Sequence, residues 1–213
     1  MHAHIQCGWT RRQFTHGEAL QIIHRSAMSI GVLATNYWKA KKHTIINKKE
    51  AWTRPMEGVL KINVDAAYDE DQGRGSIGTV VRDYTGKFIY ANCKELLFVA
   101  DPFMAEAYAL REGLSAAQFL GGNQYIIQSD NSQVIDTMND GGFSATSSAA
   151  IFDDCRILAA GYINISFEHC RREANEAAHE IARFCFENRL DCIWDDEPPS
   201  FLLPRMINDV TVI

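Results

Sequence analysis

Three runs with the residue pattern of β-strands follow one another closely in the middle of this 213-residue chain, and their order constrains the fold strongly. The runs cover residues 59–68, 75–82 and 87–94. The connections between them, DEDQGRG and DYTG, are short and rich in turn residues. Because short connections join antiparallel neighbours, the three runs predict a β-meander.

Helical and strand patterns alternate after the meander. Residues 101–122 predict a helix with Asp101 at its N-cap and Gly121 at its C-terminal cap. Further strands are expected at 125–130 and 162–170, and further helices at 131–140, 149–161 and 175–190. Because both late strands follow helical crossovers, each should lie parallel to a neighbour. The order predicts an α/β fold with a mixed five-stranded sheet and helices on both faces.

Charge divides the chain near residue 54. The net charge of −6 is the sum of +7 up to residue 54 (9 Lys and Arg, 2 Asp and Glu) and −13 beyond it (12 and 25). We expect a basic, mostly helical extension and linker over residues 1–54, one domain over 55–192, and an irregular tail over 193–213. The helix predicted at 17–42 is a candidate for packing against a protein partner or fused domain, or for contacting a polyanion.

The composition excludes several classes of protein. No segment approaches the roughly 18 uninterrupted apolar residues of a membrane span, and the first residues lack the apolar block of a secretory signal. The six cysteines form no C-x-x-C pair, which favours buried free thiols over a zinc site or a disulfide framework. We therefore expect an intracellular protein of the nucleus or cytoplasm, neither secreted nor membrane-bound.

Three acidic residues occupy particular places in this order of elements. Asp65 lies within the first strand, Glu106 in the first turns of the helix after the meander, and Asp130 at the end of the next strand. In open α/β sheets, functional sites gather at the carboxyl ends of strands, where the strand order reverses. We therefore expect Asp65 and Asp130 to be neighbours, with Glu106 projecting above them.

Clustered carboxylates restrict the chemistry of such a site. Three of them cannot all stay ionised unless a cation lies among them, and oxygen ligands favour Mg²⁺ or Mn²⁺ over zinc. Each acid also has an ordinary interpretation: Asp65 as a solvent-facing strand residue, Glu106 as a favourable charge near a helix N-terminus, and Asp130 as a helix cap. Their joint placement in one topology favours the metal site.

The segments KINVDAAY, GSIGTVVRDYTGKF, AEAYALREGL, IIQSDNSQVI and FEHCRREANEAAHEIAR resemble the ribonuclease H domain family, and most of all its plant reverse-transcriptase-like, non-LTR-retroelement-type branch. The resemblance covers about residues 52–190. It implies the strand order 3-2-1-4-5 and cleavage of the RNA strand of RNA–DNA hybrids. It also implies two Mg²⁺ or Mn²⁺ ions held by Asp65, Glu106 and Asp130.

Two departures from the family pattern leave alternatives open. His179 stands where the family has a fourth carboxylate, and an imidazole is the poorer Mg²⁺ ligand, although it could instead shuttle protons in the catalytic set. Ala66 and Ala67 replace a Gly and a polar residue that many hybrid-cleaving relatives carry. The alternatives to an active endonuclease are a non-catalytic nucleic-acid-binding module and a decayed retroelement fragment. Asn175 is expected to cap the last helix.

Overall fold

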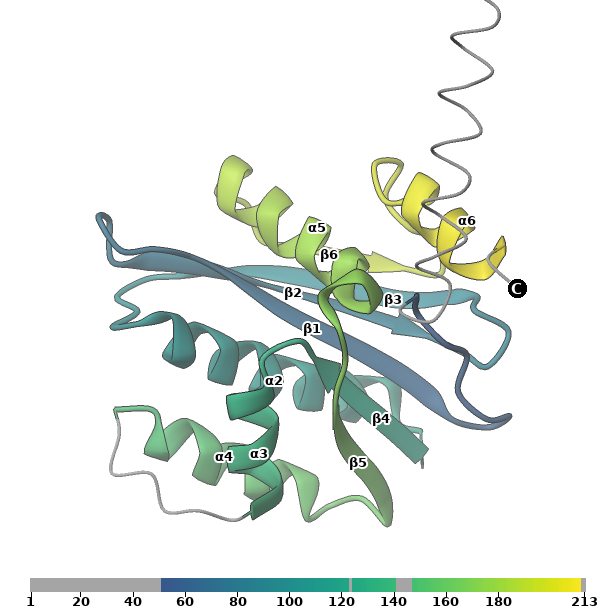
Figure 1. Ribbon diagram of the computed structural model, residues 1–213, viewed down its shortest axis with the longest axis horizontal. Coiled ribbons are helices and arrows are strands. Elements are labelled where there is room, and N and C mark those ends of the chain that lie inside the picture. Colours follow the sequence, from purple (N-terminus) through teal and green to yellow (C-terminus); the bar gives the residue numbers. More distant parts are fainter. Residues whose placement is uncertain (1–50, 123, 141–146, 212–213) are drawn as a thin grey trace, which may run out of the picture. The chain divides into compact units, whose positions relative to one another are not determined.

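A mixed six-stranded sheet forms the centre of the computed structural model, which describes residues 51–122, 124–140 and 147–211 (Figure 1). The strands lie in the order β5-β4-β1-β2-β3-β6. The first five keep the predicted order 3-2-1-4-5, and a sixth extends the sheet beyond β3. Residues 1–50, most of the helical extension expected over residues 1–54, lie outside the described residues.

The predicted meander and the two parallel additions are both confirmed. β1 (Leu60–Asp69), β2 (Arg74–Arg82) and β3 (Phe88–Leu96) pair antiparallel in sequence order. β4 (Gln124–Ser129) lies parallel to β1, and β5 (Asn164–His169) lies parallel to β4. The chain therefore reverses its direction of sheet growth between β1 and β4, which is where α/β folds place their sites.

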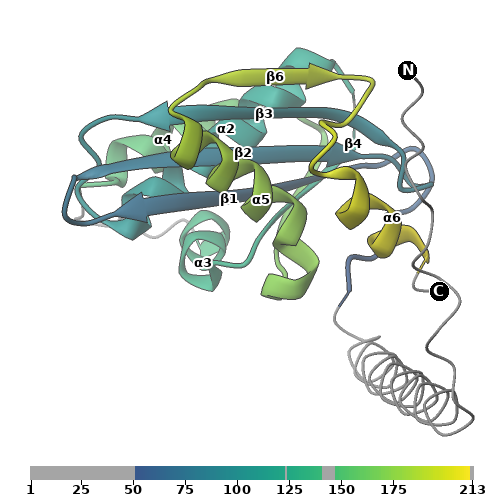
Figure 2. The same ribbon diagram turned by 90° about the horizontal axis from the view of Figure 1, so that it is seen from above.

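Helices cover both faces of the sheet, as Figures 1 and 2 show. One layer holds α2 (Pro102–Leu120), α3 (Ser132–Asp140) and α4 (Ala149–Ala159). The other holds α5 (Arg172–Asn188) and α6 (Leu203–Thr211). The predicted caps of α2 are confirmed. The Asp101 carboxylate accepts a hydrogen bond from the Met104 N–H at 2.7 Å, and Gly121 adopts φ +69°.

Two glycines set how closely a helix approaches the sheet. A β-carbon on Gly113 of α2 would lie 2.7 Å from a methyl group of Val64 in β1. One on Gly78 of β2 would collide with the backbone of Ala178 and Ala182 in α5. Gly78 also lies directly opposite Asp65 in the β1–β2 register. The missing side chain therefore lets α5 lie against the sheet at the level of Asp65.

The C-terminal segment differs from the irregular tail expected over residues 193–213. It contains β6 (Cys192–Asp195), which pairs antiparallel with β3, followed by helix α6. Phe184 of α5, Trp194 of β6 and Phe201 pack as a three-ring cluster that secures this segment. A strand of four residues is too short to show a periodic pattern, and a helix of nine residues shows that pattern over only two to three turns.

Helix α5 begins at Arg172, three residues before its expected start. Asn175 therefore lies inside the helix, and the prediction that it caps the helix is wrong. Its buried side chain points toward β1. The five described cysteines are free, and four of them are buried, as expected for structural thiols. Within the described ranges, no helix is both long and apolar enough to cross a lipid bilayer.

Candidate metal centre

The site lies where β1 and β4 part. The last parallel pair between these strands joins Asn63 to Gln128. Asp65 and Asp130 each follow two residues later, so both carboxylates emerge at the opening between the strands. Glu106 reaches the same opening from the first turns of α2. One ligand oxygen from each of the three acids lies within 4.8 Å of the others. The predicted convergence of the three side chains is thus present in the structure.

Burial raises the proton affinity of two of these acids. It raises the pKa of the Asp65 carboxyl to about 6; a hydrogen bond from His179 opposes this shift, and the charge of Asp130 adds to it. Burial likewise raises the pKa of Glu106 to about 9, with the charges of Asp65 and Asp130 adding and the Ala66 backbone N–H opposing. Three negative charges in so small a volume repel one another, and protonation relieves that repulsion.

A divalent cation would relieve the same repulsion, and the residues present fit one. All three donors are carboxylate oxygens, the ligands that Mg²⁺ and Mn²⁺ prefer. The Oε2 atom of Glu106 is buried, and no group among the described residues hydrogen-bonds to it. A buried oxygen without a partner is costly, so it requires a proton or a cation. Asp65, Glu106 and Asp130 are therefore the residues that would hold the metal.

Two asparagines brace the carboxylates. The Asn175 Nδ2 group donates to the backbone carbonyl of Val64 at 2.9 Å, and lies 3.3 Å from Asp130 Oδ1 and 3.5 Å from Asp65 Oδ1. Asn63 Nδ2 in turn donates to Asn175 Oδ1 at 3.1 Å, which fixes the orientation of that amide. Both asparagines are fully buried. Asn175 therefore connects the ends of β1 and β4 from above the sheet.

The sequence pattern alone does not assign these roles. Asn favours a helix cap, and only the earlier start of α5 places Asn175 at the site. The position of Asn63, in contrast, contains a signal. It lies two residues before Asp65, so strand alternation places both side chains on the same face of the sheet. A buried polar residue beside a candidate ligand is a recognisable mark of a supporting contact.

His179 joins the site from the second turn of α5. Its Nδ1 lies 2.8 Å from Asp65 Oδ2, and its side chain is 31% exposed. The hydrogen bond with Asp65 raises the pKa of His179, although burial opposes the shift. His179 touches one carboxylate, whereas the group of mutually close metal-binding atoms within the described part of the chain comprises only the three acids.

Other polar residues lie nearby. Arg171 and Arg172 are exposed at the start of α5. Asn131 accepts the Val134 N–H through its side chain and so caps α3. Asn131, and not Asp130, therefore caps the helix, so the interpretation of Asp130 as a helix cap does not apply. His169, at the end of β5, contacts the Asp130 backbone carbonyl at 3.2 Å and holds the β4 end in place.

Comparisons with known proteins agree with this geometry. The sequence of residues 63–185 matches the reverse transcriptase-like family. The chain belongs to this family. Comparison with curated proteins gave no match. The plant branch of the resemblance stays a prediction.

Solved structures of ribonuclease H share the fold of this reverse transcriptase-like chain. Ribonuclease H1 from Halobacterium salinarum is 21% identical, with a TM-score of 0.57, over 61% of this chain and 98% of the other. The N-terminal ribonuclease H domain of rv2228c from Mycobacterium tuberculosis gives 19% and 0.57 over 61% and 94%. LC11-RNase H1, solved with an RNA/DNA hybrid, gives 18% and 0.56 over 61% and 98%. The chain therefore has a ribonuclease H-like fold.

Proposed function

We propose that this protein is a metal-dependent endonuclease that hydrolyses the RNA strand of RNA–DNA hybrids. The single observation that carries the proposal is the convergence of Asp65, Glu106 and Asp130 at the opening between β1 and β4. Membership of the reverse transcriptase-like family supports it, as does the fold shared with a ribonuclease H1 solved on an RNA/DNA hybrid.

The side chains divide the work. Asp65, Glu106 and Asp130 would hold the divalent cations, two of them in the mechanism we propose, through their carboxylate oxygens. When bound, Mg²⁺ or Mn²⁺ supplies the positive charge that activates water and stabilises the leaving oxygen. Asn175 holds Asp65 and Asp130 at a fixed separation. His179 shares a proton with Asp65. Near neutral pH it can pass this proton to the leaving oxygen of the cleaved phosphodiester.

The test is incubation of the full chain with an end-labelled RNA–DNA hybrid and either Mg²⁺ or Mn²⁺. We expect cleavage of the RNA strand only, lost on addition of a chelator and reduced by more than about a hundredfold in Asp65→Asn, because the substitution removes a ligand charge. Duplex DNA and duplex RNA of the same sequence serve as substrate controls. If the wild-type protein cleaves the hybrid no faster than the Asp65→Asn variant does, the proposal is refuted.

A second candidate is a non-catalytic module that binds hybrids. The contact between His179 and Asp65 favours it, because an imidazole brings no negative charge to the place where the family carries a fourth carboxylate. This module would bind the hybrid with equal affinity in wild type and Asp65→Asn, without turnover under either metal. A decayed retroelement fragment would show neither metal-dependent binding nor cleavage.

A further inference from the structure

A buried ion pair ties the C-terminal helix to the interior of the sheet. Arg82, at the end of β2, has a fully buried side chain, and its Nη1 lies 2.7 Å from Asp209 Oδ2 in α6. The Arg82 guanidinium also stacks on the Trp52 ring at 3.8 Å from the centroid. A planar guanidinium held by a carboxylate on one side and an aromatic face on another has little freedom to turn.

A continuous chain of hydrogen bonds runs from this ion pair to the carboxylates. Arg82 Nη2 donates to Asn63 Oδ1 at 3.3 Å, and Trp52 Nε1 donates to the same oxygen at 3.0 Å. With its oxygen occupied, the Asn63 amide must direct its Nδ2 toward Asn175 Oδ1. Asn175 then directs its own Nδ2 at Val64, Asp65 and Asp130. Each link determines which way round the next amide lies.

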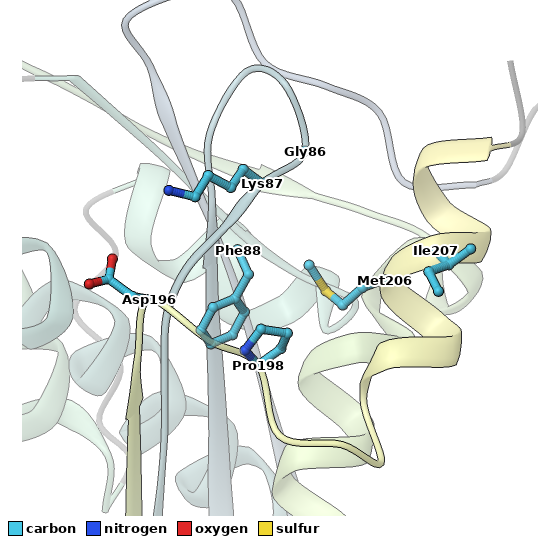
Figure 3. Close-up of a pocket in the computed structure, with 7 residues that line it drawn as sticks. All are labelled: Gly86, Lys87, Phe88, Asp196, Pro198, Met206 and Ile207. Carbon is cyan, nitrogen blue, oxygen red and sulfur yellow. The ribbon is translucent and has the colours of Figure 1, made fainter.

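Asp209, at the far end of this series of hydrogen bonds, belongs to a segment outside the family match, which ends at residue 185. Leu202 and Met206 anchor the start of α6 in the core, and the half-buried Arg205 pairs with Glu176. An open pocket of about 410 Å³ lies between the middle of α6 and the turn before β3 (Figure 3). Beyond this pocket, the Arg82–Asp209 pair ties α6 to β2.

We propose that Asp209 and Arg82 are positioning residues for the metal centre, acting through Asn63 and Asn175, so that the β6–α6 segment is a working part of the site. The inference rests on the proposed function for its consequence in catalysis, but its structural content does not need turnover. Asp209 neutralises and orients Arg82, and Arg82 in turn fixes the orientation of Asn63. The two asparagines then hold the ligand oxygens of Asp65 and Asp130 in register.

Loss of Asp209 should loosen this arrangement. A buried guanidinium that loses its carboxylate must find another acceptor, and the Asn63 side chain is already within its reach. Contacts that support metal ligands from behind commonly change metal affinity by roughly 10- to 100-fold when they are removed. We therefore expect Asp209→Ala to weaken Mn²⁺ binding about tenfold, and Asn175→Ala to weaken it at least as much.

The test uses the full chain and two readouts that do not depend on cleavage. The first is Mn²⁺ affinity by titration calorimetry. The second is the pair of side-chain amide signals of Asn63 and Asn175 by NMR without metal. Arg205→Ala is the matched control, because it also removes ion pairs between α6 and α5. Among the described residues, Arg205 makes no hydrogen bond to a member of this chain of hydrogen bonds, and it acts on Asp209 through its charge alone. Asp209→Asn, close in shape, replaces Asp209→Ala if the latter does not fold.

The proposal expects the asparagine signals and the Mn²⁺ affinity to change in the Asp209 variant, to recover in part in Asp209→Glu, and to remain unchanged in Arg205→Ala. Unchanged signals and affinity in the Asp209 variant would overturn it, as would equal changes in Arg205→Ala. If wild type binds Mn²⁺ but does not cleave hybrids, the proposed function fails while these outcomes still decide the inference. If wild type cleaves, a kcat lowered with unchanged KM is expected for Asp209→Asn.

Discussion

The most consequential residues of this protein are the buried acids, because each costs stability unless something compensates its charge. Glu106 is the extreme case: burial and two neighbouring carboxylates raise its pKa from 4.5 to about 9, and its Oε2 has no hydrogen-bonding partner among the described residues. Such a residue is poorly suited to stabilising the fold alone. It is well suited to a site where a bound cation compensates the negative charge. The stability of the fold with and without a cation therefore tests the function of the site.

The first prediction concerns Glu106→Gln in a chelating buffer. Because the folded pKa lies above the unfolded one, folding favours the protonated acid; this stability is present below about pH 4.5 and is lost as pH rises toward about 9. At pH 8, Glu106→Gln should therefore raise the free energy of unfolding, by at most about 5 kcal/mol. At pH 5 the gain should be much smaller. Urea unfolding at both pH values measures it.

Added Mg²⁺ should invert this ranking at pH 8. A cation that binds only the folded state stabilises the wild type by mass action, whereas the variant has lost a ligand charge and gains less. Glu112→Gln is a suitable control, since Glu112 lies two turns further along α2 and pairs with Lys94 outside the site. A variant that is less stable than wild type in chelator at pH 8 would contradict the prediction.

The second prediction concerns His179→Asp, which places a carboxylate beside Asp65. Without metal, the added negative charge should lower the free energy of unfolding at pH 8, because it repels Asp65 and replaces a favourable hydrogen bond. With metal, the added ligand charge should strengthen Mg²⁺ binding by about tenfold and increase hybrid cleavage. Calorimetry and a cleavage assay measure the two effects, with His179→Asn as the uncharged control. Weaker Mg²⁺ binding in His179→Asp would show that His179 is not standing in a ligand position.

At the scale of elements, the sequence predicted what local chemistry encodes. Asp101 and Gly121 predicted the two ends of α2, and the short turns predicted the meander. The three acids were found because each comes at a fixed place in that order. The start of α5 and the strand β6 escaped prediction, because they depend on contacts between residues distant in sequence. Long-range packing decides such features, and one sequence does not display it.

The third prediction concerns the approach of α5 to the sheet. Gly78→Ala places a methyl group against the backbone of Ala178 and Ala182, which cannot move aside as a flexible side chain would. We expect a loss of about 1–3 kcal/mol in the free energy of unfolding. Since Gly78 lies opposite Asp65, α5 should also move away from the site and weaken Mn²⁺ binding.

Urea unfolding and Mn²⁺ calorimetry measure the two effects of Gly78→Ala. Gly161→Ala is the matched control, because the nearest atom to its new methyl group would be the Leu158 carbonyl oxygen at 3.4 Å. That variant should change stability by less than about 0.5 kcal/mol and leave metal binding unaltered. A Gly78→Ala protein with full metal affinity would mean that α5 does not determine the geometry of the carboxylates.

At the scale of the whole molecule, the distribution of charge is at odds with a nucleic-acid substrate. Residues beyond position 54 carry −13, and the site itself is acidic, so this part repels a polyanion unless cations are bound. The preceding 54 residues carry +7. The basic segment is a candidate for phosphate contacts, and such contacts would be measurable in the salt dependence of binding.

The fourth prediction follows from that division. The segment before residue 51 holds eight of the nine Lys and Arg found up to residue 54. If three of them contact phosphates, its removal should make the slope of log affinity against log salt shallower by about 3 and weaken hybrid binding severalfold at low salt. Fluorescence anisotropy in Ca²⁺, over a range of potassium chloride concentrations, measures both quantities. Replacing Lys39, Lys41 and Lys42 together with Gln should reproduce part of the change without shortening the chain. An unchanged slope in both variants would assign the phosphate contacts to the acidic part and its bound cations.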